Sequence, residues 1–224
     1  MNKQLMLEKQ KKLGISIPQI VREEYEMILL NSIFQSSFGK DLVFRGGTVL
    51  RLAYGSPRYS DDLDFSQIKE INEKIFKDWC VKIAKKNTSL KLIEVLQKYY
   101  TLFANFQIND SSLERSINIK VEISCRKTRW VKNQNYILSQ LFSQVTPITV
   151  LAQVATLPQI KKEKQSISPL RIRDIFDLWF IGQKLKEQVS MDFSGFSIRE
   201  IKQDLHKLLP QEQWVLIEKW ISKK

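Results

Sequence analysis

The feature that most constrains this chain is an apolar segment that ends in two glycines and is followed, thirteen residues later, by two aspartates. Residues 43–48 read VFRGGT, and residues 62–65 read DLDF. A strand that ends in Gly46 and Gly47 lets the backbone approach a polyphosphate closely, because neither residue has a side chain that would hold the anion away. The hydroxyl of Thr48 adds a hydrogen-bond donor. These residues are candidates for binding the phosphates of a nucleotide.

The two aspartates, Asp62 and Asp64, alternate with apolar residues. If Leu63 and Phe65 face the core of a strand, the two carboxylates lie side by side on its opposite face. Such a pair suits a hard, oxygen-seeking cation such as Mg²⁺. Either motif alone is common, since Gly-Gly also marks tight turns. Joined at this spacing, the two motifs predict a nucleotide site with a metal.

Length and composition indicate a folded protein. The chain has 224 residues, of which 43% are hydrophobic, so it can bury a core and falls between one domain and two compact ones. No apolar run approaches the roughly eighteen residues of a spanning helix, and residues 1–14 lack the apolar region of a signal peptide. We therefore expect a cytoplasmic protein without a membrane partner.

Cysteine and histidine are too scarce for several kinds of site. The chain has two cysteines, Cys80 and Cys125, without a CxxC pair, and one histidine, His206. These counts exclude a zinc site and a disulfide scaffold, and no nucleophile motif accompanies the histidine. Both cysteines are expected to be small buried hydrophobes.

The net charge of +12 is concentrated in one part of the chain. Residues 126–173 contain nine basic residues and one acid, Glu163. This pattern favours a polyanionic partner, with nucleic acid as the leading candidate, and Trp130 and Tyr136 could stack on bases. A solvated, solubilising face is the alternative. The candidate RNA-binding residues are Arg126, Lys127, Arg129, Lys132, Lys161, Lys162 and Lys164.

Periodicity predicts an α+β protein. Strands are expected at 42–45, from 63 onward, and at 101–108 and 117–125. Helices are expected at 18–38, 48–54, 71–86, 148–157, 174–187, 198–208 and 211–222, with a polar loop over 161–169. Strand patterns cease beyond residue 130. We therefore expect a core of residues 1–135, with an N-terminal covering helix, and a helical subdomain of residues 136–224.

The strand expected at 117–125 carries a third acid. Its apolar residues alternate strictly with polar ones, which places Lys120 and Glu122 together on one polar face. Glu122 is either a site residue or an exposed acid paired with Lys120.

A strand, two glycines and a helix, then Asp-x-Asp on the next strand and an acid on a later one, resemble the DNA polymerase β type of nucleotidyltransferase. This resemblance implies a mixed sheet with flanking helices, and a reaction in which three carboxylates hold two Mg²⁺ ions, or Mn²⁺ in their place. Asp62 and Asp64 would bridge the metals, and Glu122 would help to hold the metal that activates the acceptor hydroxyl.

Longer strings narrow the resemblance. Residues 44–52 (FRGGTVLRL), 58–65 (RYSDDLDF), 119–124 (IKVEIS) and 173–179 (RDIFDLW) look like the AbiEii family of nucleotidyltransferase toxins from abortive-infection and type IV toxin–antitoxin systems. The similarity spans roughly residues 40–182. It implies an enzyme that uses a nucleoside triphosphate, releases pyrophosphate and transfers nucleotides to RNA, notably the acceptor end of tRNA, which would block translation.

The resemblance also implies partners and further site residues. A separately encoded antitoxin, expected to be a winged-helix regulator, would protect the host. Lys120 and Asp174 are further candidates for nucleotide binding, although Asp174 equally suits a helix N-terminus. The acceptor could instead be a protein hydroxyl, or the chain could be a non-catalytic RNA-binding or partner-binding module that retains the fold.

One segment departs from the family pattern. The helix expected at residues 151–157 usually carries an acid and a lysine that contacts the triphosphate, but here Gln153 and Val154 occupy those positions. Binding of the β- and γ-phosphates would then depend on Lys161, Lys162 or Lys164 reaching in from the next segment. A changed nucleotide specificity and a degenerate enzyme are the alternatives.

Overall fold

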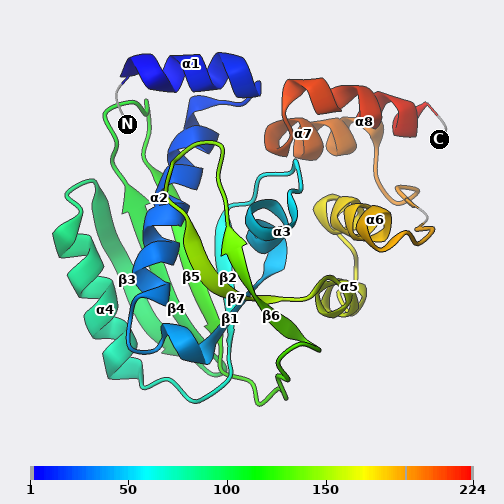
Figure 1. Ribbon diagram of the computed structural model, residues 1–224. Helices are drawn as coiled ribbons and strands as arrows, with labels where there is room; N and C mark the ends of the chain where they lie inside the picture. Colours follow the sequence, from blue (N-terminus) through cyan, green and yellow to red (C-terminus); the bar gives the residue numbers. More distant parts are fainter. Residues whose placement is uncertain (1–2, 190, 223–224) are drawn as a thin grey trace.

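The computed structural model describes residues 3–189 and 191–222 and has a mixed α+β architecture, as the sequence predicts (Figure 1). Its centre is a seven-stranded sheet in the order β3-β4-β5-β2-β1-β7-β6. The strands are β1 (Leu42–Arg45), β2 (Asp62–Gln67), β3 (Leu90–Lys98), β4 (Thr101–Ile108), β5 (Ile117–Ser124), β6 (Tyr136–Leu141) and β7 (Val150–Ala155). The α-helices are α1 (Lys3–Leu13), α2 (Ile17–Phe34), α3 (Gly46–Tyr54), α4 (Glu73–Lys86), α5 (Leu157–Gln165), α6 (Ile172–Leu185), α7 (Ile198–Leu208) and α8 (Trp214–Ile221).

The order of the strands places β2 at the middle of the sheet. It pairs antiparallel with β1 on one side and parallel with β5 on the other, so that Asp64 lies opposite Arg45 and Glu122 respectively. Leu63 and Phe65 of β2 are fully buried. The polar residues of β2 therefore lie on the opposite face, as the alternation predicts.

Helix α2 lies across one face of the sheet (Figure 1). Its start is fixed by Ser16, whose hydroxyl accepts a hydrogen bond from the backbone N–H of Gln19, while the Gln19 side chain accepts one from the Ser16 N–H. The ring of Phe34 at its end lies 6.1 Å from that of Phe65. Helix α2 therefore covers the apolar face of β2, and Asp62 and Asp64 lie on the opposite face.

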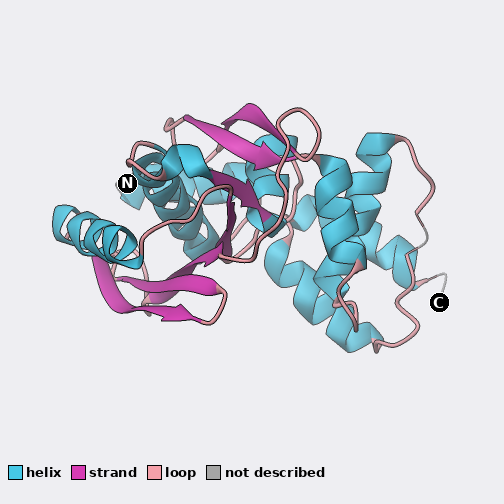
Figure 2. Ribbon diagram, turned by 90° about the horizontal axis from the view of Figure 1, so that it is seen from below, coloured by secondary structure: helices cyan, strands magenta, loops and turns pink. Residues whose placement is uncertain are grey.

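The C-terminal helices gather beside the sheet, in one group (Figure 2). An aromatic cluster joins α6 to α8, with Trp179 and Trp220 ring centroids 4.9 Å apart and Phe176 against both. This helical group presents α5 and α6 to the polar face of the central strands. None of the helices in the described part of the chain combines the length and hydropathy that a membrane crossing requires.

Two sequence-based predictions of secondary structure are wrong. The segment 148–157, expected to be a helix, contains strand β7 instead. This strand lies between β1 and β6, next to one edge of the sheet. Residues 150–155 form a short apolar run, which fits a buried parallel strand as well as a helix. The loop expected at 161–169 is helical as far as Gln165 in α5.

Strand patterns were expected to end near residue 130, but β6 and β7 both belong to the sheet. The sheet therefore reaches residue 155, and the purely helical part begins at Leu157. Helix α1 and strand β3 were not predicted. The division into residues 1–135 and 136–224 stays a prediction, and strands β6 and β7 lie on the sheet side of any such division.

Candidate active site

Asp62, Asp64 and Glu122 line a cavity of about 590 Å³, which we call the carboxylate cavity. Strands β2 and β5 run parallel, and Asp64 lies opposite Glu122 in their register. Asp62 and Asp64 are two residues apart on one strand face. The structure thus brings together all three acids that the sequence singled out.

Asp64 is the acid that the protein surrounds most closely. Burial raises its pKa to about 6, and the charges of Asp62 and Glu122 act in the same direction, while Arg45 and Lys164 oppose the shift. Clustered carboxylates in a buried site repel one another and gain from a bound cation.

The donor set of the carboxylate cavity fits Mg²⁺ in its chemistry. All three side chains offer hard carboxylate oxygens. In the described part of the chain, however, no three acidic, histidine or cysteine side chains converge on a position that could hold a metal ion. Mg²⁺ is commonly held by one or two carboxylates together with substrate phosphates and water, so this arrangement is compatible with a metal that arrives with the nucleotide.

The two glycines at the start of α3 are required by packing. Gly46 has a φ of 84°, and a Cβ there would lie 3.0 Å from the Asp64 Cβ and overlap its Oδ2. A Cβ on Gly47 would overlap the Arg58 guanidinium and lie 2.8 Å from the hydroxyl of Ser60. The absence of side chains therefore allows the cavity wall to close around Asp64.

The hydroxyl of Thr48, predicted to be a phosphate donor, already has a hydrogen-bond partner within the protein. It is 1% exposed, and its hydroxyl donates to the backbone carbonyl of Asp62 at 2.6 Å. This hydrogen bond helps to hold the start of β2 in place, and phosphate binding by Thr48 stays a prediction.

A network of charges borders the same cavity through Arg58, Lys164, Arg171 and Asp174. The amine of Lys164 on α5 lies 3.0 Å from Asp174 and 2.7 Å from Asp177, both on α6. Arg58 donates two hydrogen bonds to Asp177, at 2.6 and 2.7 Å, and Arg171 donates to Asp174 at 2.6 and 3.1 Å. Lys164, Asp174 and Asp177 are almost completely buried, so each charge depends on its partners.

Asp174 is ionised by its neighbours. Burial opposes its charge, but the hydrogen bond from Arg171 and the contacts with Lys164 outweigh burial and lower the pKa of Asp174 to about 2. Its carboxylate orients two cations, Lys164 and Arg171, that line the carboxylate cavity. The network thus presents positive charge opposite the carboxylates of β2 and β5.

Within the residues that the structure describes, two buried donors on the cavity lining have no hydrogen-bond partner. They are Arg45 Nε and the indole Nε1 of Trp130. An unsatisfied buried N–H is costly, and a ligand rich in oxygen would satisfy both groups. These donors favour an anionic occupant of the cavity.

The predicted RNA-binding residues are not all available to a polyanion. Arg126, Lys127, Arg129 and Lys162 are exposed. Lys164 is buried in the charge network, and Lys161 is paired with Glu187. Lys132 is exposed and lines a small separate cavity with Gln153. The exposed Lys120 does not line the carboxylate cavity.

The expected base-stacking role of Trp130 and Tyr136 is not supported. Each is only 9% exposed, and their rings pack together with centroids 6.5 Å apart. They belong to the core, in agreement with the common role of aromatic residues in this kind of environment.

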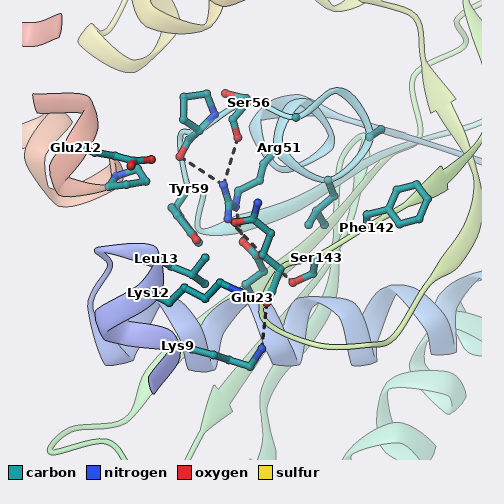
Figure 3. A pocket seen from close by; sticks show the side chains of 16 residues that line it. Lys9, Lys12, Leu13, Glu23, Arg51, Ser56, Tyr59, Phe142, Ser143 and Glu212 are labelled. Atoms are coloured by element: carbon teal, nitrogen blue, oxygen red, sulfur yellow. Dashed lines mark hydrogen bonds and ion pairs between the residues drawn. The ribbon is translucent and has the colours of Figure 1, made fainter. Parts of the chain in front are cut away.

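A second cavity, of about 780 Å³, lies beside the segment that joins α3 to β2 (Figure 3). Ser56, Pro57 and Tyr59 line it, whereas Arg58 of the same segment lines the carboxylate cavity. Its Arg51 is already engaged, by Glu23, by the carbonyl oxygens of Ser56 and Pro57 and by the Tyr59 ring at 3.5 Å. This arrangement supports the segment, and the carboxylate cavity is the stronger candidate for chemistry.

Residues 28–212 match the family described as "Nucleotidyl transferase AbiEii toxin, Type IV TA system". The chain belongs to this family. Two solved structures share the AbiEii-type fold of this chain. MenT4, a nucleotidyltransferase toxin from Mycobacterium tuberculosis, has a TM-score of 0.61 and 15% identity, over 97% of this chain and 87% of that one. JHP933 from Helicobacter pylori has a TM-score of 0.56 and 18% identity, over 83% of this chain and 72% of that one. No curated protein matches the sequence.

Within this AbiEii protein, the sequence did not reveal two contributors to the site. Arg58 was noted only as part of a family string, and Arg45 only as the residue before the glycines. Both line the carboxylate cavity. Their positions depend on the pairing of Arg58 with Asp177, 119 residues away, and of Arg45 with Glu163, 118 residues away, which no local pattern reveals.

Proposed function

We propose that this AbiEii nucleotidyltransferase is a metal-dependent enzyme that transfers nucleotides from a nucleoside triphosphate to RNA, with the acceptor end of tRNA as the substrate that would account for toxicity. The observation that carries the proposal is the position of Asp62, Asp64 and Glu122 opposite the cations of α5 and α6 in one cavity. The carboxylates suit metal cations, and the cationic side chains suit phosphates.

The triphosphate would be bound by Lys164 and Arg171. An ammonium group has three N–H donors, and two of those on Lys164 are accounted for by Asp174 and Asp177. The third is left for a phosphate oxygen. Arg171 has a half-exposed side chain on the same lining, and Arg45 Nε and Trp130 Nε1 supply further donors.

Lys164 would take the place of the lysine that the family pattern led us to expect at Val154. Val154 is fully buried within β7, where no lysine could reach the cavity. Lys161 and Lys162 do not line the carboxylate cavity, whereas Lys164 does. We therefore assign triphosphate binding to Lys164, and Asp174 acts as a positioning residue for it.

The reaction forms one bond and breaks one. The acceptor hydroxyl oxygen bonds to the α-phosphorus, the bond from that phosphorus to the oxygen bridging to the β-phosphate breaks, and pyrophosphate leaves with the electron pair. The hydroxyl proton passes to a carboxylate oxygen of the cluster. Mg²⁺ held by Asp62 and Asp64, with Glu122, would supply positive charge to the reacting phosphate oxygens.

The proposal is tested by incubating the protein with each of the four nucleoside triphosphates, labelled at the α-phosphate, together with Mg²⁺ and either total tRNA or RNase-treated cell extract. Label should appear in RNA and should depend on Mg²⁺. Label in protein alone would assign the acceptor to a protein hydroxyl and overturn the RNA proposal. Growth inhibition that survives Asp64→Asn would instead favour a non-catalytic binding module.

The family also implies a cognate antitoxin. We propose a winged-helix regulator for this role, encoded beside the toxin. Co-expression of the neighbouring gene should restore growth of cells that produce this protein. Restoration by an unrelated gene product and not by the neighbour would contradict the pairing.

A further inference from the structure

One face of β5 leads out of the carboxylate cavity. Glu122 and Ser124 lie two residues apart on β5, Arg126 follows two residues beyond its end, and all three line the cavity. Each step of two residues covers about 7 Å along an extended chain. The cavity therefore continues beyond the carboxylates, along the end of β5, toward Arg126.

Arg126 also lines a neighbouring cavity of about 440 Å³ at the turn between β3 and β4, which we call the hairpin cavity. Thr128 is shared by the two cavities in the same way. Tyr100 is held beside this path because its carbonyl oxygen accepts a hydrogen bond from Cys125 N–H at 2.7 Å. The carboxylate cavity and the hairpin cavity are thus neighbours with a common wall.

Two adjacent tyrosines border the hairpin cavity. Tyr99 is 96% exposed and Tyr100 is 60% exposed. Neither ring is buried in the core. The backbone of Tyr99 has a φ of 29°, in a region that glycine or asparagine adopts more readily. The Arg126 guanidinium lies 5.9 Å from the Tyr100 ring centroid.

Three cations and two acids line the cavity beside these rings. Lys69, Arg126 and Lys127 line the hairpin cavity together with Glu70 and Glu73. Exposed aromatic rings interleaved with cations are characteristic of surfaces that bind single-stranded nucleic acid, since every base has a face that can stack.

We infer that the hairpin cavity binds the single-stranded 3′ end of the acceptor RNA, with Tyr99 and Tyr100 stacking on bases and Arg126 contacting the backbone. The inference rests on the proposed function and adds the direction in which the RNA strand runs through the site. The terminal hydroxyl points toward Glu122, and the preceding nucleotides follow Ser124 and Arg126 to the tyrosines. The triphosphate occupies the opposite end, near Lys164.

The test uses a fluorescently labelled twelve-nucleotide single-stranded RNA and the full-length protein. Tyr99→Ala and Tyr100→Ala should each weaken RNA binding by about tenfold, whereas Tyr100→Phe should bind like the wild type, because the ring remains. Phe142→Ala is the matched control, since Phe142 is 58% exposed and lines the second cavity instead. Triphosphate binding should be unchanged in all four variants.

Salt dependence separates stacking from charge. Arg126→Gln should reduce the slope of log K against log salt concentration by about 0.7, the value for one phosphate contact on a single strand. The alanine variants of the tyrosines should leave the slope unchanged.

Three results would overturn the inference. The first is equal RNA affinity of the wild type and both alanine variants, and the second is no RNA binding by the wild type. The third is loss of labelling from the α-labelled triphosphate in Tyr100→Phe, which would make the tyrosine hydroxyl itself the acceptor. If the wild type labels RNA while the alanine variants bind RNA normally, the proposed function stands and only the assignment of RNA binding to the hairpin cavity is wrong. If the wild type labels protein alone, the proposed function fails first.

Discussion

Lys164 on α5 and Asp174 on α6 form a buried ion pair at 3.0 Å, and the same amine reaches Asp177 at 2.7 Å. This contact joins α5 to α6, the two helices that follow the last strand in sequence. Lys164 and Asp174 both line the carboxylate cavity. The contact gives a structural role to the two aspartates of the Arg-Asp-x-x-Asp element at the start of α6. Both aspartates hold cations in position.

Replacing Lys164 with Met should therefore lower both stability and nucleotide affinity. Two buried carboxylates lose a partner, and breaking a buried pair typically costs about 3–5 kcal/mol, with Arg58 and Arg171 reducing the loss here. Urea unfolding and triphosphate titration measure the two effects. Lys162→Met, at an exposed position of the same helix, should change neither. Equal behaviour of the two variants would contradict the role of the network.

Gly46→Ala should inactivate the protein, and Gly55→Ala should not. Both glycines have positive φ, 84° and 75°, so each alanine brings backbone strain of about 1–2 kcal/mol. Only at Gly46 would the new Cβ also displace Asp64, because nothing lies within 4 Å of a Cβ at Gly55. Labelled transfer, measured beside thermal unfolding, distinguishes the two effects. An active Gly46→Ala variant would show that the position of Asp64 is not critical.

Thr48→Val should reduce stability by about 1–3 kcal/mol, because the buried Asp62 carbonyl loses its donor. Thr48→Ser keeps the hydroxyl and should retain most of the stability. If the hydroxyl bound phosphate instead, the valine variant would lose triphosphate affinity without losing stability. Denaturant unfolding and nucleotide titration of both variants decide between these roles.

Glu26 should make stability depend on pH. It is 3% exposed, and its Oε1 has no hydrogen-bond partner among the described residues. Burial, reinforced by Glu23, raises the pKa of Glu26 well above its usual value. The folded state thus binds a proton more tightly than the unfolded state, so stability is highest below the unfolded pKa and falls as pH rises through the folded pKa.

Glu26→Gln should remove this part of the pH dependence and be relatively more stable at pH 8 than at pH 5. The quantity to compare is the difference in unfolding free energy between variant and wild type at the two pH values. Glu94→Gln, at an exposed position on β3, should show no such change. A constant difference for Glu26→Gln would mean that the carboxyl group is ionised at both pH values.

The central site could be predicted because its signals are local. The alternation around Asp62 and Asp64, and again around Glu122, fixes which side of each strand is polar, and the structure places the three acids on one lining. The identity of the family follows from the same strings.

The remaining parts depend on long-range contacts. Residues 150–155 are too short and too uniformly apolar for periodicity to distinguish a strand from a helix, and their pairing with β1 decides the outcome. The burial of Lys164 in an ion-pair network could not be predicted for a related reason. A count of charges does not reveal that its partners, Asp174 and Asp177, lie on the next helix.

The most direct measurement of the central claim is Mg²⁺-dependent transfer of an α-labelled nucleoside triphosphate to tRNA by the wild type and by Asp64→Asn. Asp78→Asn, at an exposed position on α4, is the matched control. We predict that the wild type and the control label tRNA, and that Asp64→Asn does so at least a hundredfold more slowly while remaining folded. Labelling by Asp64→Asn at the wild-type rate would contradict the account.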